Sequence, residues 1–113
     1  MTFSHDRIGI IGMGLMGSAV MQRTGAACGW DRDAARCVSA ATADDVFGRC
    51  EVVFLCLPTS GIVREVLRGA TLKPGLVLID TTTGDPAEMA ALGAEMAAQG
   101  IHELGLQRAI KGG

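Results

Sequence analysis

Three glycines near the amino end of the chain, Gly12, Gly14 and Gly17, are the residues whose spacing points most directly to chemistry. They follow the apolar residues 8–11, which are typical of a strand covered on both faces. The first glycine permits a tight turn, the second lets main-chain amides approach an anion, and the third lets a helix pack on the strand. The N–H groups at the start of that helix attract phosphate. This pattern predicts a strand, a phosphate-binding turn and a helix over residues 13–24.

Two other interpretations of the same stretch were weighed. Residues 8–21 carry no charge and follow Arg7, as in a secretory signal. No convincing cleavage site follows, however, and the run is shorter than the roughly 20 residues needed to span a bilayer. Each glycine would also weaken a signal helix by about 1 kcal/mol relative to alanine. A glycine-rich turn without a ligand remains the alternative to the phosphate-binding turn.

An acidic residue follows the glycines at a meaningful distance. Asp31 stands nineteen positions beyond Gly12. An acid about 20 residues after such a turn accepts hydrogen bonds from the ribose hydroxyls of an adenine dinucleotide. The spacing therefore extends the predicted site from the phosphates to the adenosine.

Other residue types offer little for catalysis or metal binding. The four cysteines lack the CxxC spacing of a zinc site, and there are only two histidines. We expect the thiols to be buried or half-buried, without a redox role. Because reduced thiols are typical of the cytosol, a cytoplasmic location is expected. No catalytic residue and no metal site is predicted.

Composition limits the class of protein and its partners. The 113 residues are 49% hydrophobic and 19% charged, which predicts one folded domain rather than a disordered chain. This length is short for a cofactor domain together with a separate substrate domain. The net charge of −2 provides no attraction to nucleic acid or to an anionic membrane. Small molecules or proteins are the expected partners.

The predicted elements alternate between strand and helix. Residues 52–57 and 76–79 are continuous apolar runs of the kind found in central parallel strands, and residues 101–104 are a further candidate strand. A helix with one apolar face follows residues 59–60, which can cap it.

A further helix, expected from Asp85 to Gly100, has the clearest boundary signals. Asp85 is placed to cap it, Pro86 occupies its first position, and Glu88 would complete a capping box. Gly100 supplies the left-handed residue after its end. Repeated strand and helix units of this kind predict an α/β fold.

The fold expected is a Rossmann-like, doubly wound parallel sheet in three α/β/α layers. In such sheets ligands bind beyond the carboxyl ends of the strands. The segments at those ends should form one crevice: residues 12–17, 31–32, 57–59 and 80–84.

Four motifs together resemble a known family. GMGLMG at 12–17, WDR at 30–32, VVFLCLP at 52–58 and DTTTGDP at 80–86 occur in the order found in 3-hydroxyisobutyrate dehydrogenase-like β-hydroxyacid dehydrogenases. These enzymes are related to 6-phosphogluconate dehydrogenase. The resemblance covers about residues 8–104 and implies an NAD(P)-binding domain of an oxidoreductase. Such an enzyme transfers hydride between a nicotinamide cofactor and a small 3-hydroxy acid.

The resemblance also implies where a bound dinucleotide would lie. Asp31 favours NAD, because a carboxylate accepts bonds from the 2′-hydroxyl and repels a 2′-phosphate, whereas Arg32 can instead bind that phosphate or stack on adenine. NAD is thus favoured, with NADP as the alternative. The implied positions are Gly12, Met13, Gly14, Met16 and Gly17 around the pyrophosphate, Asp31 and Arg32 at the adenosine ribose, and Leu57, Pro58 and Thr83 near the nicotinamide.

The chain is shorter than the family pattern in its first two crossovers. Between Gly17 and Asp31 about one helical turn is lacking, so the first helix should end at Gly25. Between Asp31 and Glu51 the second helix or the third strand should be reduced to a turn, around residues 34–41.

The carboxyl end departs further from the family. We expect residues 1–104 to form the NAD(P)-binding domain and residues 105–113 a divergent tail, with the helical catalytic domain of the family absent. Lys111 lies too near the terminus, without neighbours to lower its pKa, to replace the family's catalytic lysine.

Two hypotheses follow. The chain is the cofactor-binding part of a dehydrogenase, incomplete and inactive alone, or it is a small nucleotide-binding or protein-interaction module without catalysis. Under both, self-association or a missing catalytic domain would cover an apolar face.

Overall fold

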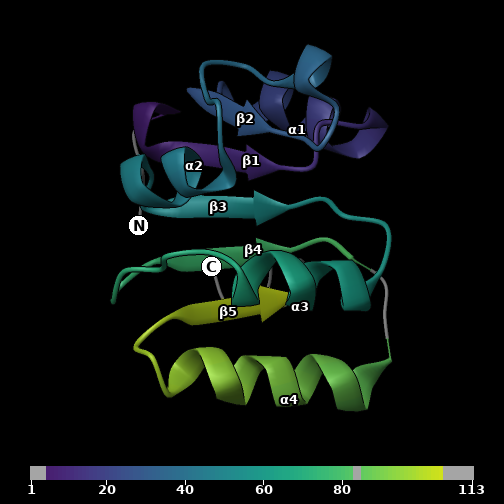
Figure 1. The fold of residues 1–113 in the computed structure, drawn as a ribbon, viewed down its shortest axis with the longest axis vertical. Helices are drawn as coiled ribbons and strands as arrows, with labels where there is room; N and C mark the ends of the chain where they lie inside the picture. The colour runs from purple at the N-terminus through teal and green to yellow at the C-terminus, as the bar shows by residue number, and fades with distance from the viewer. Residues whose placement is uncertain (1–4, 83–84, 106–113) are drawn as a thin grey trace.

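The computed structural model describes residues 5–82 and 85–105 of the chain. Over these residues one parallel sheet has the strand order β2-β1-β3-β4-β5 (Figure 1). Its continuous apolar runs are typical of strands that are covered by helices. The order confirms the predicted Rossmann-like sheet. The strands are β1 (Ile8–Ile11), β2 (Cys28–Trp30), β3 (Val52–Leu55), β4 (Val77–Asp80) and β5 (His102–Gly105).

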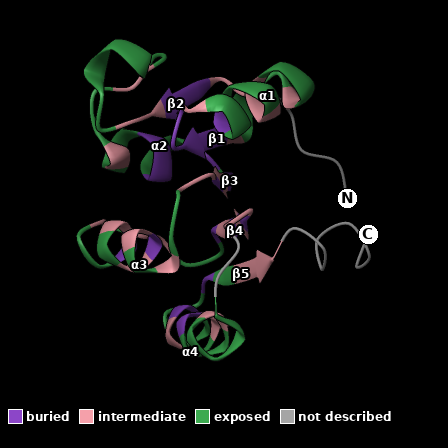
Figure 2. Ribbon diagram, turned by 90° about the vertical axis from the view of Figure 1, so that its right-hand side faces the viewer, coloured by how far each residue is buried: buried purple, intermediate pink, exposed green. Residues whose placement is uncertain are grey.

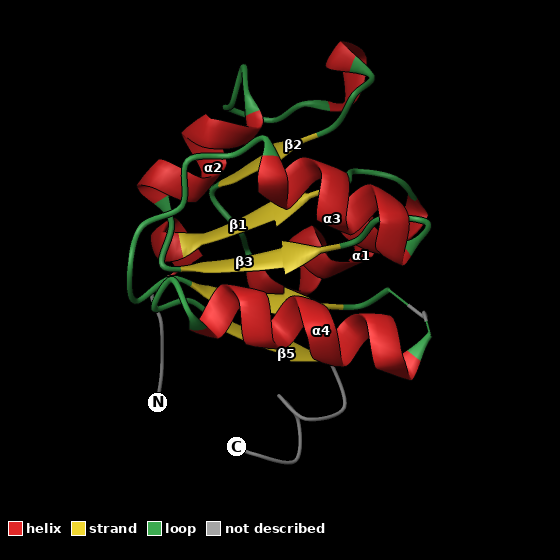
Figure 3. Cartoon of the chain, turned by 60° about the horizontal axis from the view of Figure 1, so that its bottom comes forward, coloured by secondary structure: helices red, strands yellow, loops and turns green. Residues whose placement is uncertain are grey.

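Helices lie on both sides of the sheet, which confirms the three layers. Helix α1 (Leu15–Thr24) lies on one face, whereas α2 (Ala43–Arg49), α3 (Ser60–Arg68) and α4 (Pro86–Ala97) lie on the other (Figure 2). Figure 3 shows α3 and α4 side by side over the strands. None of the helices in the described part of the chain is both long and apolar enough to cross a membrane.

The main core lies between the sheet and the three helices on one face. Each helix contributes two buried apolar side chains, which meet the inward residues of β1, β3 and β4. Burying such side chains contributes roughly 1.5–3 kcal/mol each relative to exposure. The helical contributions are Val46 and Phe47 from α2, Val63 and Leu67 from α3, and Leu92 and Met96 from α4.

The shortened crossovers take the form expected. Helix α1 ends at Gly25, whose φ is 68°. After β2 the chain makes a single 3-10 turn, η2 (Ala34–Arg36), and an isolated antiparallel bridge joins Val38 to Gly29. The extra strand expected between Asp31 and Glu51 is thus reduced to this one bridge. The seven-residue α2 then leads into β3.

One predicted helix cap is wrong in its chemistry. Asp85 is the N-cap of α4, Pro86 follows it, and Gly100 has a φ of 78°, all as expected. The Asp85 side chain, however, makes no capping hydrogen bond. Glu88 instead accepts a hydrogen bond of 2.7 Å from the Ser60 hydroxyl, so it joins α4 to the start of α3 rather than completing a box.

Candidate functional site

A cleft of about 570 Å³ lies where β1, β2, β3 and β4 end. Parallel strands bring their carboxyl ends to one edge, so the four segments predicted to form a crevice do meet there. Half-buried and exposed side chains form its walls. The lining residues are Gly12, Gly14, Leu15, Met16, Trp30, Asp31, Arg32, Arg36, Cys56, Leu57, Pro58, Ile62, Val66, Thr81 and Thr82.

Two of the three glycines are required by packing. Gly12 has a φ of 97°, and a Cβ there would collide with the carbonyl oxygen of Cys56. A Cβ on Gly17 would collide with the carbonyl oxygen of Gly12. Gly12 lets the turn cross the end of β3, and Gly17 lets α1 pack directly against that turn.

Gly14 differs from the other two. Its φ is −75°, which any residue adopts, and the nearest atom to a Cβ there would be Nη1 of Arg36, at 3.9 Å. The fold therefore does not need a glycine at this position. Gly14 lines the cleft at the N-cap of α1, where its missing side chain leaves the first amides of the helix open to an anion.

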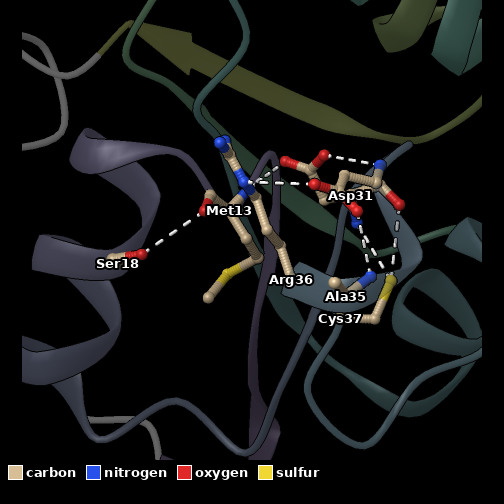
Figure 4. A network of polar contacts seen from close by, with 7 residues as sticks. Met13, Ser18, Asp31, Ala35, Arg36 and Cys37 are labelled. Carbon is tan, nitrogen blue, oxygen red and sulfur yellow. Dashed lines mark hydrogen bonds and ion pairs between the residues drawn. The ribbon is translucent and has the colours of Figure 1, made fainter.

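Asp31 joins this turn to the end of the cleft that follows β2. Its Oδ2 accepts a hydrogen bond of 2.8 Å from the backbone N–H of Met13, and its Oδ1 accepts one of 2.8 Å from that of Asp33 (Figure 4). A carboxylate oxygen has two lone pairs, so each oxygen retains one for a further donor. The half-buried carboxylate can thus hold the turn and still receive ribose hydroxyls.

Two arginines border this end of the cleft, and each is paired with a carboxylate. Nη2 of Arg32 lies 3.5 Å from Oε2 of Glu65, on α3. Nε of Arg36 lies 3.6 Å from Oδ2 of Asp33. Arg36 was not predicted as a site residue. Its signal was Asp33, whose side chain accepts from the N–H of Ala35 and so begins the turn that carries Arg36 to the cleft.

At the opposite end, hydroxyl groups hold two strand ends together. The Thr81 hydroxyl donates to the carbonyl of Leu55 at 2.9 Å, and the Thr82 hydroxyl donates to that of Leu57 at 3.1 Å. Oδ1 of the buried Asp80 accepts from the N–H of Thr82 at 2.8 Å. These contacts fix the position of the loop that carries the Leu57 side of the cleft.

The cysteines have no evident catalytic part in this arrangement. Cys28 and Cys50 are buried with their sulfurs 3.5 Å apart, and neither lines the cleft. Burial raises the pKa of the Cys56 thiol, which therefore stays protonated at neutral pH. Within residues 5–82 and 85–105, no three His, Cys, Asp or Glu residues gather closely enough to hold a metal ion.

Most positions assigned from the sequence lie in this cleft. Met13 is only 7% exposed and packs on Gly29, and Gly17 is buried beneath the turn, so both lie under the cleft. Thr83 falls outside the described residues. The positions that line the cleft are Gly12, Gly14, Met16, Asp31, Arg32, Leu57 and Pro58.

Solved structures with the same fold come from dehydrogenases and reductases. A 3-hydroxyisobutyrate dehydrogenase from Mycobacterium tuberculosis, solved with L-serine, is 25% identical with a TM-score of 0.75 over 87% of this chain and 38% of that one. A reductive aminase from Aspergillus terreus, solved with NADPH and ethyl levulinate, is 22% identical, with a TM-score of 0.80 over 88% and 40% of the chains.

A further 3-hydroxyisobutyrate dehydrogenase, from Salmonella typhimurium, is 23% identical with a TM-score of 0.69 over 85% and 39% of the chains. The chain thus spans about 40% of the length of these proteins. A comparison with curated protein sequences gave no significant match.

The family assignment comes from the sequence and agrees with the structural likenesses. Residues 7–107 match the NAD binding domain of 6-phosphogluconate dehydrogenase. The match includes the glycine turn, Asp31 and the strand ends that form the cleft. The chain therefore belongs to the 6-phosphogluconate dehydrogenase family of NAD-binding domains.

Proposed function

We propose that the cleft binds NAD(H) as the cofactor site of a β-hydroxyacid dehydrogenase-like oxidoreductase. One observation carries the proposal most strongly: Gly14 faces the cleft as a glycine that the fold does not require. A residue kept free of a side chain beside a helix N-terminus is what close approach of a pyrophosphate requires.

The order of the lining residues indicates where each part of the dinucleotide would lie. The pyrophosphate lies over Gly12 and Gly14, and the free lone pairs of Asp31 receive the ribose hydroxyls. The nicotinamide points towards Leu57 and Pro58, with Thr83 as its proposed neighbour. Hydride transfer is the chemistry that the nicotinamide supplies, and the cleft residues bind and orient it.

The charges at the adenosine end favour NAD over NADP. Asp31 would stand close to a 2′-phosphate and repel it. Arg32 and Arg36 are the groups suited to bind such a phosphate, but both already face carboxylates. We therefore propose NAD as the preferred cofactor.

Turnover requires parts that the described residues do not supply. The reaction we propose is oxidation of a small 3-hydroxy acid, with its substrate and catalytic groups held by a helical domain of the kind found in the family. The described residues offer no general base beside Leu57 and Pro58, where Cys56 is protonated. The 113-residue chain alone is expected to bind cofactor without catalysis.

One face of the sheet carries apolar side chains that no described helix covers. The register places Phe54, Ile79 and Leu104 on the same face as α1. All three are half-buried, and α1 packs on β1 and β3, so no described helix covers β4 and β5 on this side (Figure 2). A catalytic domain or a second copy of the chain would bury this apolar surface.

Cofactor binding can be tested with an intrinsic reporter. Trp30 is the only tryptophan in the chain and lines the cleft, so NADH should quench its fluorescence on binding. Gly14→Ala places a methyl group under the pyrophosphate and should weaken NADH binding at least about tenfold, with stability changed by less than about 1 kcal/mol.

Gly48→Ala is the matched control, because a Cβ at Gly48, in α2, has no neighbour within 4 Å. It should leave NADH binding unchanged. Equal binding by the Gly14→Ala and wild-type chains would contradict the proposed site. Reduction of NAD by the chain with 3-hydroxyisobutyrate would show that no further domain is needed.

A further inference from the structure

We propose that Glu65 makes the adenosine end of the cleft selective against a 2′-phosphate by neutralising Arg32. This inference rests on the proposed dinucleotide site and adds a residue that determines its cofactor preference. Glu65 belongs to α3, on the far side of the cleft from the glycine turn, and no sequence motif associates it with nucleotide binding.

The position of the ion pair supports this role. Trp30, Arg32 and Val66 line both the main cleft and an adjoining hollow of about 330 Å³. Glu65 lines the hollow, and its Oε2 reaches Nη2 of Arg32 at 3.5 Å. The pair therefore bridges β2 and α3 at the point where the adenosine would pass between the two spaces.

The charges near this bridge explain why neutralisation matters. Asp31, Asp33, Asp44 and Glu65 provide four carboxylates against the two guanidinium groups of Arg32 and Arg36. A 2′-phosphate would add about two negative charges to this group. To bind it, Arg32 must give up Glu65, whose charge would then remain nearby unpaired. A 2′-hydroxyl carries no such charge and needs only the lone pairs of Asp31.

The Arg32–Glu65 pair is exposed, which limits how much it can change NADPH affinity. Its side chains are 61% and 71% exposed, so water and salt screen both partners. Glu65 should therefore change NADPH affinity by a modest factor and leave NADH affinity nearly unaltered. A role in folding alone would change the binding of both nucleotides together.

The experiment compares NADH and NADPH binding at low salt by Trp30 fluorescence. Glu65→Gln should strengthen NADPH binding about three- to tenfold and change NADH binding by less than about twofold. Adding Arg32→Gln to this variant should abolish the gain, since the gain depends on the released guanidinium. Glu95→Gln is the control: Glu95 pairs with Arg68 at 3.6 Å, neither residue lines the cleft or the hollow, and the loss of Glu95 should not change the ratio of NADPH to NADH affinity.

The outcomes separate this inference from the proposed function. If the wild-type chain binds NADH but Glu65→Gln leaves the NADPH to NADH ratio unchanged, the selective role of Glu65 is wrong and the site stands. The same conclusion follows if the gain survives in the double variant. If the wild-type chain binds neither nucleotide, the proposed site and this inference both fail.

Discussion

The glycine turn and the charged rim beside it, formed by Arg32, Asp33, Arg36 and Glu65, are neighbouring parts of one site that are built in different ways. The turn is made of main chain, and its glycines at positions 12 and 17 are demanded by close contacts with neighbouring carbonyl groups. The rim is made of long charged side chains, most of which are more than half exposed. We infer that the turn provides the affinity for a dinucleotide, whereas the rim adjusts which dinucleotide is preferred.

Gly17→Ala should have the largest effect, because it disrupts the packing of α1 against the glycine turn. The added methyl group would overlap the Gly12 carbonyl oxygen and lie 3.3 Å from Cγ2 of Ile10, so α1 must move away from β1. We expect the free energy of unfolding to fall by roughly 3 kcal/mol and NADH binding to be lost. Urea unfolding would measure the first and Trp30 fluorescence the second. Unaltered stability would mean that the turn is looser than its contacts indicate.

Asp31→Ala should have the next largest effect, because it removes the side chain that joins the glycine turn to the charged rim. The N–H groups of Met13 and Asp33 would lose their acceptor. We expect NADH affinity to fall about tenfold and stability by about 1–2 kcal/mol, as for loss of charged hydrogen bonds. Asp44→Ala, which removes a carboxylate that accepts a hydrogen bond from the N–H of Thr71, is the control for stability. An NADH affinity equal to that of the wild type would show that the ribose is held elsewhere.

Arg36→Gln tests the rim nearest the turn. Its Nη1 lies 3.9 Å from the Cβ position of Gly14, close to the proposed pyrophosphate. Since the side chain is 56% exposed, we expect NADH to bind about two- to fivefold more weakly at low salt. The difference should shrink as salt is raised, which a titration series at increasing ionic strength would measure. A salt-independent loss would indicate a packing role instead.

The smallest effect should come from acidification at α2, outside the cleft. Backbone N–H groups of Thr42 and Ala41 donate to Asp45 and hold its pKa below the usual range. A lowered pKa in the folded chain contributes stability above the ordinary value, and this contribution is lost as the pH falls through the lowered value. Asp45→Asn should therefore flatten the decline in melting temperature at acid pH. An equally steep decline in the variant would locate the acid-sensitive group elsewhere.

Local patterns predicted more of the strands than of the helices. Continuous apolar runs located β1, β3 and β4, because a strand buried on both faces has few polar residues. The sequence left open whether the second helix or the extra strand would be reduced, since the apolar face of α2 consists of only Val46 and Phe47, and packing against the sheet stabilises so short a helix. The capping box expected at Asp85 failed for a related reason, because Ser60 on another helix supplied a donor for Glu88.

The sequence by itself determined the strand, the glycine turn, the helix after it and the acid that follows. Those features depend on backbone conformations and spacings that neighbouring residues dictate. Only the tertiary structure decided which polar groups meet: the Asp31 carboxylate with the backbone N–H of Met13, eighteen positions away, and Arg32 with Glu65 on α3. The first pairing depends on β2 lying beside β1, and the second on how α3 crosses the sheet. No short stretch of sequence contains that information.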